Sequence, residues 1–368
     1  MDVAKHTKYY QGGHMKDSKY YVGMDVHKAA TVITVLNSAG KQIMKSIVET
    51  KANTILDVVK GLRGEIHLTF EEGTHSSWLY DLLKSQVYQL IVCNPRDEKL
   101  RSSGNKSDDI DSYKLAEMLR LGGLKAVYHG QEEMRKLQEL TRSYQYLVED
   151  CTRVKNRIKA IFRARAISYK GDSIYQASKR LDWLAQLKEE GVKNRAQYLY
   201  QELDCLLTLC EQSQKEMIAE ARKHKAFKIL DSIPTLGSIR VALILAAMLT
   251  PHRFGNKRQL WCYSGLAVVS SSSADYSIVN GQIKKSKKQV ATRGLNHNFN
   301  RTLKMVFKTA ATSVSKGILK DYYDALLAKG TSPQMARLTL ARKLAAIVLS
   351  LWKKGEGFNP DKFVTQTV

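Results

Sequence analysis

The sequence predicts an α/β domain at the amino-terminal end, a long helical region in the middle and a mostly helical carboxyl-terminal domain. Three observations predict this class. Short apolar segments alternate with amphipathic helical segments over residues 20–121, a coiled-coil seam follows, and residues 295–352 have a mostly helical pattern. We assign a flexible leader to residues 1–18, an α/β domain to 19–125, a coiled-coil region to 126–225 and a carboxyl-terminal domain to 226–368.

The α/β domain is predicted element by element. Residues 20–26, 30–36 and 41–48 are apolar or β-branched and closely spaced, which is typical of a three-strand meander. Then come a helix at 53–63, a strand at 66–70, a helix at 76–84, a strand at 87–93 and a helix from about 108 to 121, ending at Gly122-Gly123. The order β-β-β-α-β-α-β-α is the connectivity of a ribonuclease-H-like fold.

The middle of the chain has the spacing of a coiled coil. Seam residues recur in alternate steps of three and four over about 36 Å of helix: Leu137, Leu140, Tyr144, Leu147, Cys151, Val154, Ile158 and Ile161. A second helical stretch has similar spacing at Leu199, Leu203, Leu206, Cys210 and Met217. The two helices are expected to form an antiparallel hairpin or to pair with another subunit.

The composition indicates a polyanionic partner. The 368 residues include 59 Lys and Arg against 35 Asp and Glu, a net charge of +24, which favours binding to nucleic acid or an acidic membrane surface. The longest apolar run, residues 241–249, is too short to span a bilayer. Five cysteines without a CxxC pair indicate reduced thiols rather than a disulfide framework or zinc site. We therefore expect a soluble, cytoplasmic protein that binds nucleic acid.

Four acids are predicted to meet at one edge of the sheet. Asp25 ends the first strand and Glu71 the fourth, while Asp108 and Asp111 share one face of a helix start. In a ribonuclease-H-like sheet the first and fourth strands are neighbours, and the helix after the fifth strand crosses them. Clustered carboxylates repel unless cations neutralise them, and oxygen ligands favour Mg²⁺ or Mn²⁺. Two such ions about 4 Å apart can promote phosphoryl transfer.

Structural roles are the alternative for each acid alone. Asp108 and Asp109 could cap the helix, and Asp111 could be a favourable first-turn charge. Glu72 and Asp109 are local rivals, but Glu72 should face the opposite side of its strand from Glu71. Asp109 lies one helix step off the shared face. The combination of acids in this element order favours the metal interpretation.

The carboxyl-terminal domain contains two candidate nucleic-acid elements. Residues 229–237 followed by an apolar helix resemble a helix-hairpin-helix, whose turn would bring Thr235 and Gly237 to a DNA phosphate. Thr235 stands where the usual hairpin has its first glycine, and a plain helical packing element is the alternative. A serine run at 270–273 precedes basic residues that would neutralise phosphates, or form a solvated patch: Lys284, Lys285, Lys287, Lys288 and Arg293.

Several segments together resemble the DEDD transposases of bacterial insertion sequences, which are bridge-RNA-guided recombinases related to the Piv DNA invertases. They are the segments 22–28 (VGMDVHK), 70–74 (FEEGT), 93–95 (CNP), 105–111 (NKSDDID), 233–237 (IPTLG) and 263–266 (YSGL), with the serine-rich loop after them. The resemblance extends over residues 20 to about 350.

The resemblance implies a RuvC-like domain carrying the four acids, a coiled coil and a transposase domain with a nucleophilic serine. That serine corresponds to Ser273, eight residues after Gly265; Ala274 follows it where the family usually has glycine, and the segment around Ser286 lacks the family's Lys-x-Gly. The implied activity is strand cleavage and exchange through a phosphoserine–DNA intermediate. The implied cofactors are two Mg²⁺ or Mn²⁺ ions.

The implied partners are donor and target DNA, a structured guide RNA and further copies of the chain, as a dimer or tetramer held by the coiled coil. We weigh two alternatives against this reading. One is a RuvC-like, metal-dependent nuclease that cleaves branched DNA without serine chemistry. The other is a non-enzymatic, basic coiled-coil protein that binds DNA.

Overall fold

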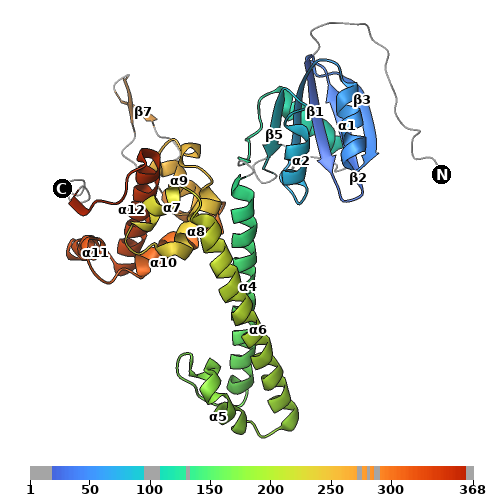
Figure 1. The fold of residues 1–368 in the computed structure, drawn as a ribbon. Helices are drawn as coiled ribbons and strands as arrows, with labels where there is room; N and C mark the ends of the chain where they lie inside the picture. The colour runs from blue at the N-terminus through green and yellow to red at the C-terminus, as the bar shows by residue number, and fades with distance from the viewer. Residues whose placement is uncertain are drawn as a thin grey trace. The chain divides into compact units, whose positions relative to one another are not determined.

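The chain divides into two units, residues 1–129 and 130–368 (Figure 1). The computed structural model describes residues 19–94, 108–129, 133–271, 276–279, 282–285 and 291–361. The first unit is a mixed α/β domain and the second is mostly helical. This division into an amino-terminal sheet and a helical remainder confirms the predicted class.

A five-stranded sheet with the order β3-β2-β1-β4-β5 forms the first unit. Its strands are β1 (Lys19–Val26), β2 (Ala30–Leu36), β3 (Gln42–Glu49), β4 (Glu65–Glu71) and β5 (Gln89–Cys93). The β1–β2 and β2–β3 pairs are antiparallel, whereas β1–β4 and β4–β5 are parallel. The predicted element order is confirmed, and the first and fourth strands are neighbours as a ribonuclease-H-like connectivity requires.

Helices cover both faces of this sheet. They are α1 (Ala52–Gly61), α2 (Ser76–Leu83) and α3 (Asp108–Arg120). Val22 and Met24 of β1 share one core with Ile55 of α1 and Leu79 of α2. Since successive strand residues face opposite sides, Gly23 faces the other way, where α3 packs against β1. Strand β2 is buried along nearly its whole length, in keeping with its apolar and β-branched residues.

Two long helices, α4 (Glu133–Arg163) and α6 (Glu190–Ala221), lie side by side in the second unit (Figure 1). Their antiparallel pairing is defined by three contacts: Lys136 Nζ to Glu220 Oε2 at 3.2 Å, Cys151 Sγ to Cys210 Sγ at 3.7 Å, and Arg157 Nη1 to Glu202 Oε1 at 3.8 Å. The connecting segment holds η2 (Ser173–Tyr175), η3 (Ala177–Lys179) and α5 (Arg180–Ala185).

The hairpin is thus formed within one chain, which was one of the two expected arrangements. From Cys151 to Ile161 the predicted seam is buried against α6 residues such as Tyr200 and Leu203. The supercoiled packing of a coiled coil, and any pairing with a second subunit, stay predictions.

The rest of the second unit is built around one nearly all-apolar helix. The helices are α7 (Ala226–Asp231), α8 (Gly237–Met248), α9 (Lys257–Tyr263), α10 (Arg301–Thr312), α11 (Ile318–Ala328) and α12 (Pro333–Lys354), with the short η4 (Pro251–Arg253). Helix α8 is buried on most sides, in keeping with its lack of a polar face. Leu137 of α4 and Met217 of α6 belong to the same core, so the base of the hairpin and these helices pack as one body.

Four short strands were not predicted. Strand β6 (Val268–Ser271) pairs antiparallel with β9 (Ala291–Leu295), and β7 (Tyr276–Val279) pairs with β8 (Gln282–Lys285). The first half of the expected serine loop is therefore strand, with Ser270 opposite Thr292 and Ser271 opposite Ala291. Each of these strands has only four or five residues, which is too short for an apolar alternation to be recognised from the sequence.

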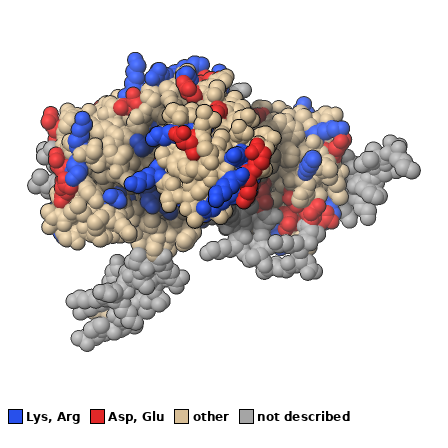
Figure 2. Space-filling model, turned by 90° about the horizontal axis from the view of Figure 1, so that it is seen from below, with Lys and Arg blue, Asp and Glu red and all other residues tan. Residues whose placement is uncertain are grey.

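The described surface carries charges of both signs. On the face drawn in Figure 2, lysine and arginine side chains are interspersed with aspartate and glutamate. Among the described helices, none combines the length and the apolar composition needed to cross a membrane.

Candidate metal centre

The register of two parallel strands brings Asp25 and Glu71 to the same edge of the sheet. Met24 of β1 lies beside Phe70 of β4, and each acid is the next residue of its strand. The Asp25 side chain is 13% exposed, and Glu71 Oε1 is buried. Both carboxylates therefore lie at the end of neighbouring strands in partly shielded positions.

Helix α3 brings Asp108 to this edge, and two buried features set its position. A Cβ on Gly23 would lie 2.2 Å from Ser112 O and 2.5 Å from Ala116 N, so only glycine lets the helix approach β1 this closely. The Thr34 and Ser112 hydroxyls are hydrogen-bonded at 2.8 Å in a buried position. These contacts hold the first turn of α3, with Asp108 and Asp111, over the sheet.

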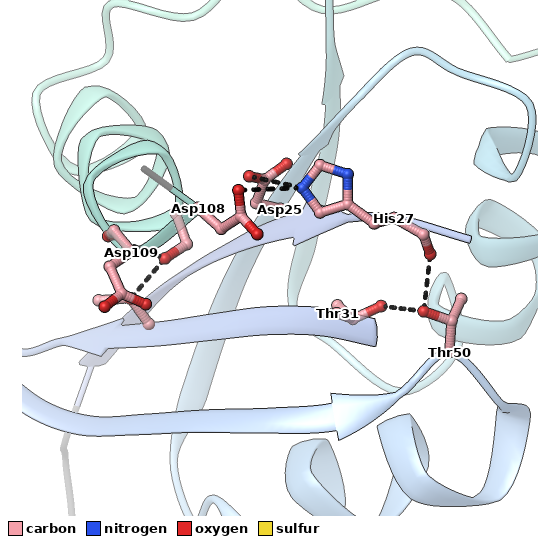
Figure 3. Close-up of polar contacts among 8 residues, drawn as sticks. Asp25, His27, Thr31, Thr50, Asp108 and Asp109 are labelled. Atoms are coloured by element: carbon pink, nitrogen blue, oxygen red, sulfur yellow. Dashed lines mark hydrogen bonds and ion pairs between the residues drawn. The ribbon is translucent and has the colours of Figure 1, made fainter. Parts of the chain in front are cut away.

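His27 joins two of the acids. Its Nε2 lies 3.3 Å from Asp25 Oδ2 and 3.4 Å from Asp108 Oδ1, and its ring points toward both carboxylates (Figure 3). The backbone of His27 is held by a bond from its N–H to Ala30 O at 3.1 Å and one from Thr50 Oγ1 to its carbonyl at 2.8 Å.

His27 had not been predicted as a site residue. The available signal was its spacing: a residue two positions after Asp25 falls on the same side of an extended chain. That signal was weak because β1 ends at Val26, and the position of a side chain beyond a strand depends on the turn.

Within the described residues, one group of three potential ligands has donor atoms within 4.8 Å of one another: Asp25, His27 and Asp108. Glu71 and Asp111 share the strand edge and the helix start but are not part of this group. Asp111 is half-buried one turn after Asp108, on the same helical face by periodicity. The structure thus brings two of the four predicted acids into direct proximity and the other two to the adjoining positions.

The two rival acids have other partners. Asp109 forms an ion pair with Lys45 of β3. Glu72 Oε2 lies 2.9 Å from His129 Nε2, whose ring stacks on Tyr80. Both carboxylates therefore take part in local contacts of the first unit.

The donor set suits a divalent cation. Two carboxylate oxygens and an imidazole nitrogen lie within 4.8 Å of one another, and adjacent ligands of a six-coordinate ion at about 2.1 Å are about 3.0 Å apart. The Asp108 and His27 side chains are 62% and 52% exposed, so the site is open on one side. A phosphate oxygen or water could complete the coordination there.

The predicted hairpin residues Thr235 and Gly237 lie at the start of α8 in the second unit. Both residues have a left-handed backbone conformation, with φ of 73° at Thr235 and 60° at Gly237. Thr235 therefore adopts the conformation natural to the glycine that usually occupies its place, at a cost of about 1–2 kcal/mol. Its carbonyl accepts a hydrogen bond of 2.7 Å from Arg240 Nη1.

Only part of the predicted serine and basic segment lies within the described residues. Lys284 and Lys285 lie on β8 and Arg293 on β9, without described side chains. Ser273, Lys287 and Lys288 lie outside the described residues. Their roles stay predictions.

Two family models match the chain. One, described as a transposase, matches residues 22–164, which include all four predicted acids. The other, described as a transposase of the IS116/IS110/IS902 family, matches residues 227–324, from α7 into α11.

Two curated relatives are similar to this chain. The transposase for insertion sequence element IS1533 of Leptospira borgpetersenii is 29% identical over 177 residues, covering 46% of this chain and 51% of the relative. The chain therefore matches about half of that relative's length. A putative transposase of Sinorhizobium fredii is 24% identical over 287 residues, covering 74% of this chain and 69% of the relative. Since one family model covers the acidic sheet edge and a second covers the helices around α8, the chain belongs to the IS110 family of DEDD transposases.

Proposed function

We propose that this protein is an insertion-sequence transposase that cleaves and rejoins DNA strands, with the acidic edge of the sheet as its metal centre. The observation that carries the proposal is the convergence of Asp25 and Asp108 on one imidazole, although they lie in different elements far apart in the sequence. The family membership supplies the class of reaction, and the net charge of +24 suits a polyanionic substrate.

Asp25, Glu71, Asp108 and Asp111 would hold one or two Mg²⁺ or Mn²⁺ ions in a RuvC-like domain. Bound there, the ions would stabilise negative charge on the phosphoryl oxygens and assist deprotonation of the attacking group. The protein's own contribution is placement. The β1–β4 register and the close packing of α3 on Gly23 would keep the carboxylates near one another before DNA binds, which would reduce the cost of organising the site during the reaction.

Ser273 is our candidate nucleophile, on the strength of the family resemblance. Its Oγ would form a bond to the scissile phosphorus while the bond from phosphorus to the departing deoxyribose oxygen breaks. The hydroxyl proton leaves and the departing oxygen gains a proton. The phosphoserine link retains the energy of the broken phosphodiester, so a second DNA end can reverse the step and rejoin the strand.

Three further assignments belong to the same proposal. A structured guide RNA would bind the basic surface together with donor and target DNA. The helix-hairpin-helix residues Thr235 and Gly237, with Lys284, Lys285, Lys287, Lys288 and Arg293, would contact phosphates. The coiled-coil region would join copies of the chain into a dimer or tetramer, so that acids from one copy and the serine of another could act on one strand.

The test is strand exchange on synthetic element-junction DNA, supplied with the structured RNA encoded beside the element. We expect Asp25→Asn to lower the rate by about 100-fold or more. Ser273→Ala should abolish both exchange and the protein–DNA adduct seen on a denaturing gel. Ser271→Ala and Ser272→Ala are the matched controls and should retain both.

Each negative result of these tests would identify a different error in the proposal. If Asp25→Asn is inactive while Ser273→Ala still cleaves DNA without forming an adduct, the protein is a metal-dependent nuclease. If neither variant changes cleavage or exchange, the catalytic proposal is wrong. If strand exchange proceeds without RNA, the guide RNA is not part of the function, whereas the proposed cleavage and rejoining chemistry still stands.

A further inference from the structure

The imidazole of His27 lies where a ligand of a shared ion would lie. Adjacent ligands of a six-coordinate ion at about 2.1 Å are about 3.0 Å apart. The distances from His27 Nε2 to the Asp25 and Asp108 oxygens, 3.3 and 3.4 Å, are close to that spacing. They are longer than the 2.7–2.9 Å usual for a charge-assisted hydrogen bond. His27 Nε2 is thus almost equally far from the two carboxylates and forms a short hydrogen bond with neither.

The surroundings of His27 support a built position rather than a chance contact. Its carbonyl accepts the Thr50 hydroxyl, which is itself 2.9 Å from the Thr31 hydroxyl, so the turn after β1 is tied to β2 and to the end of β3 (Figure 3). The backbone is fixed while half of the side chain is exposed. The ring can therefore turn slightly to meet an ion without disturbing the core.

We propose that His27 Nε2 is a third protein ligand of the ion held by Asp25 and Asp108. The inference deepens the proposed function and rests on it. A neutral imidazole with its proton on Nδ1 presents a lone pair at Nε2. Imidazole nitrogen suits first-row transition ions, whereas Mg²⁺ prefers oxygen alone. His27 therefore makes this position select Mn²⁺ over Mg²⁺ more strongly than four carboxylates would.

The experiment is a titration of the full-length protein with Mn²⁺, followed by electron paramagnetic resonance, and competition with Mg²⁺ in the absence of nucleic acid. Wild type should show nitrogen coupling to the bound Mn²⁺. His27→Ala should lose that coupling and bind Mn²⁺ about tenfold more weakly or worse, because removing even a residue that only supports a ligand costs about 10–100-fold in metal affinity. Mg²⁺ affinity should fall less, so the Mn²⁺/Mg²⁺ preference should decrease. His27→Gln, which keeps a polar side chain without a ring, should behave in the same way.

His129→Ala is the matched control, because His129 also lies beside a carboxylate of the first unit, that of Glu72. It should leave the nitrogen coupling and both affinities unchanged. Thermal unfolding of each variant separates loss of a ligand from loss of the fold.

Two outcomes overturn the inference at different levels. If Asp25→Asn weakens Mn²⁺ binding but His27→Ala changes neither the coupling nor the metal preference, the role of His27 is wrong and the carboxylate centre stands. If Asp25→Asn binds Mn²⁺ as tightly as wild type, the metal centre of the proposed function is itself wrong, and the inference fails with it.

Discussion

The sheet edge of the first unit and the helical hairpin of the second are organised by different kinds of contact. At the sheet edge, side chains from three distant segments meet because of a few individual contacts, including the absence of a Cβ at Gly23 and the bond between Thr34 and Ser112. In the hairpin, many equivalent apolar residues repeat along two helices. The geometry of the sheet edge therefore depends on a few individual contacts, whereas the stability of the hairpin is distributed over many residues.

The polar groups differ in the same way. On the hairpin, acids are paired with arginines, as in the two bonds of 2.5 and 2.6 Å from Arg180 of α5 to Asp204 of α6, whose side chain is 56% exposed. Inside it, burial raises the pKa of the Cys210 thiol to about 11, because the thiolate would be poorly solvated between the helices. At the sheet edge, two carboxylates instead converge on one histidine. An acid paired with an arginine indicates a structural role, whereas two carboxylates that converge on one point indicate a site for a cation.

The largest expected effect comes from a cavity in the hairpin. Ile158→Ala removes a fully buried seam side chain and should lower the free energy of unfolding of the second unit by about 2–5 kcal/mol. Chemical denaturation followed by helical circular dichroism measures this loss. Mn²⁺ binding by the first unit should not change.

Leu207→Ala is the control for this variant, because Leu207 lies on α6 with 43% of its surface exposed. Its effect should stay within about 0.5 kcal/mol. A loss of Mn²⁺ binding in Ile158→Ala would show that the two regions are coupled and would contradict the contrast drawn between them.

An intermediate effect is expected from added volume at the sheet edge. Gly23→Ala places a methyl group against the backbone of α3 and should cost about 1–3 kcal/mol in unfolding free energy of the first unit. Because α3 must move, Mn²⁺ affinity should fall as well. The measurement combines thermal unfolding with the Mn²⁺ titration.

Gly61→Ala is the matched control, since a Cβ at Gly61 would meet no atom within 4 Å and the residue ends α1. It should be neutral or stabilise by up to about 1 kcal/mol. Unchanged Mn²⁺ binding in folded Gly23→Ala would show that the position of α3 does not determine the metal centre.

The smallest effect is a pH dependence in the hairpin. Hydrogen bonds from Arg180 lower the pKa of Asp204 below its usual value. The pair therefore stabilises the folded state above the unfolded pKa, near 3.8, and this stability is lost as the pH falls through the lower, folded pKa. Because Asp204 is 56% exposed, the effect should be below about 1 kcal/mol.

Asp204→Asn tests this contribution of the Arg180–Asp204 pair to stability. Its unfolding free energy should be slightly lower than that of wild type at pH 6, and the difference should shrink at pH 3 and below. A difference that grows as the pH falls would have the wrong sign and would exclude this role for the pair.

Much of the sheet could be predicted because its elements are long and strongly patterned. Each predicted strand and helix of the first unit lies within about three residues of its observed bounds, and the neighbouring positions of Asp25 and Glu71 follow from strand order. His27 was missed because its side chain lies beyond the end of β1, where a turn decides its direction. Strands β6 to β9 were missed because segments of four or five residues are too short to show an apolar period.

The class of each region could be predicted from the chain alone, since the periodicity of apolar residues and the placement of glycine and acids are local properties. The chain alone also indicated which acids could meet, because the order of elements restricts the sheet to few topologies. Three features emerge only in the folded molecule: α4 and α6 pair within one chain, α3 packs closely on Gly23, and His27 lies beside both Asp25 and Asp108. These features depend on contacts between segments far apart in the sequence, which no local pattern records.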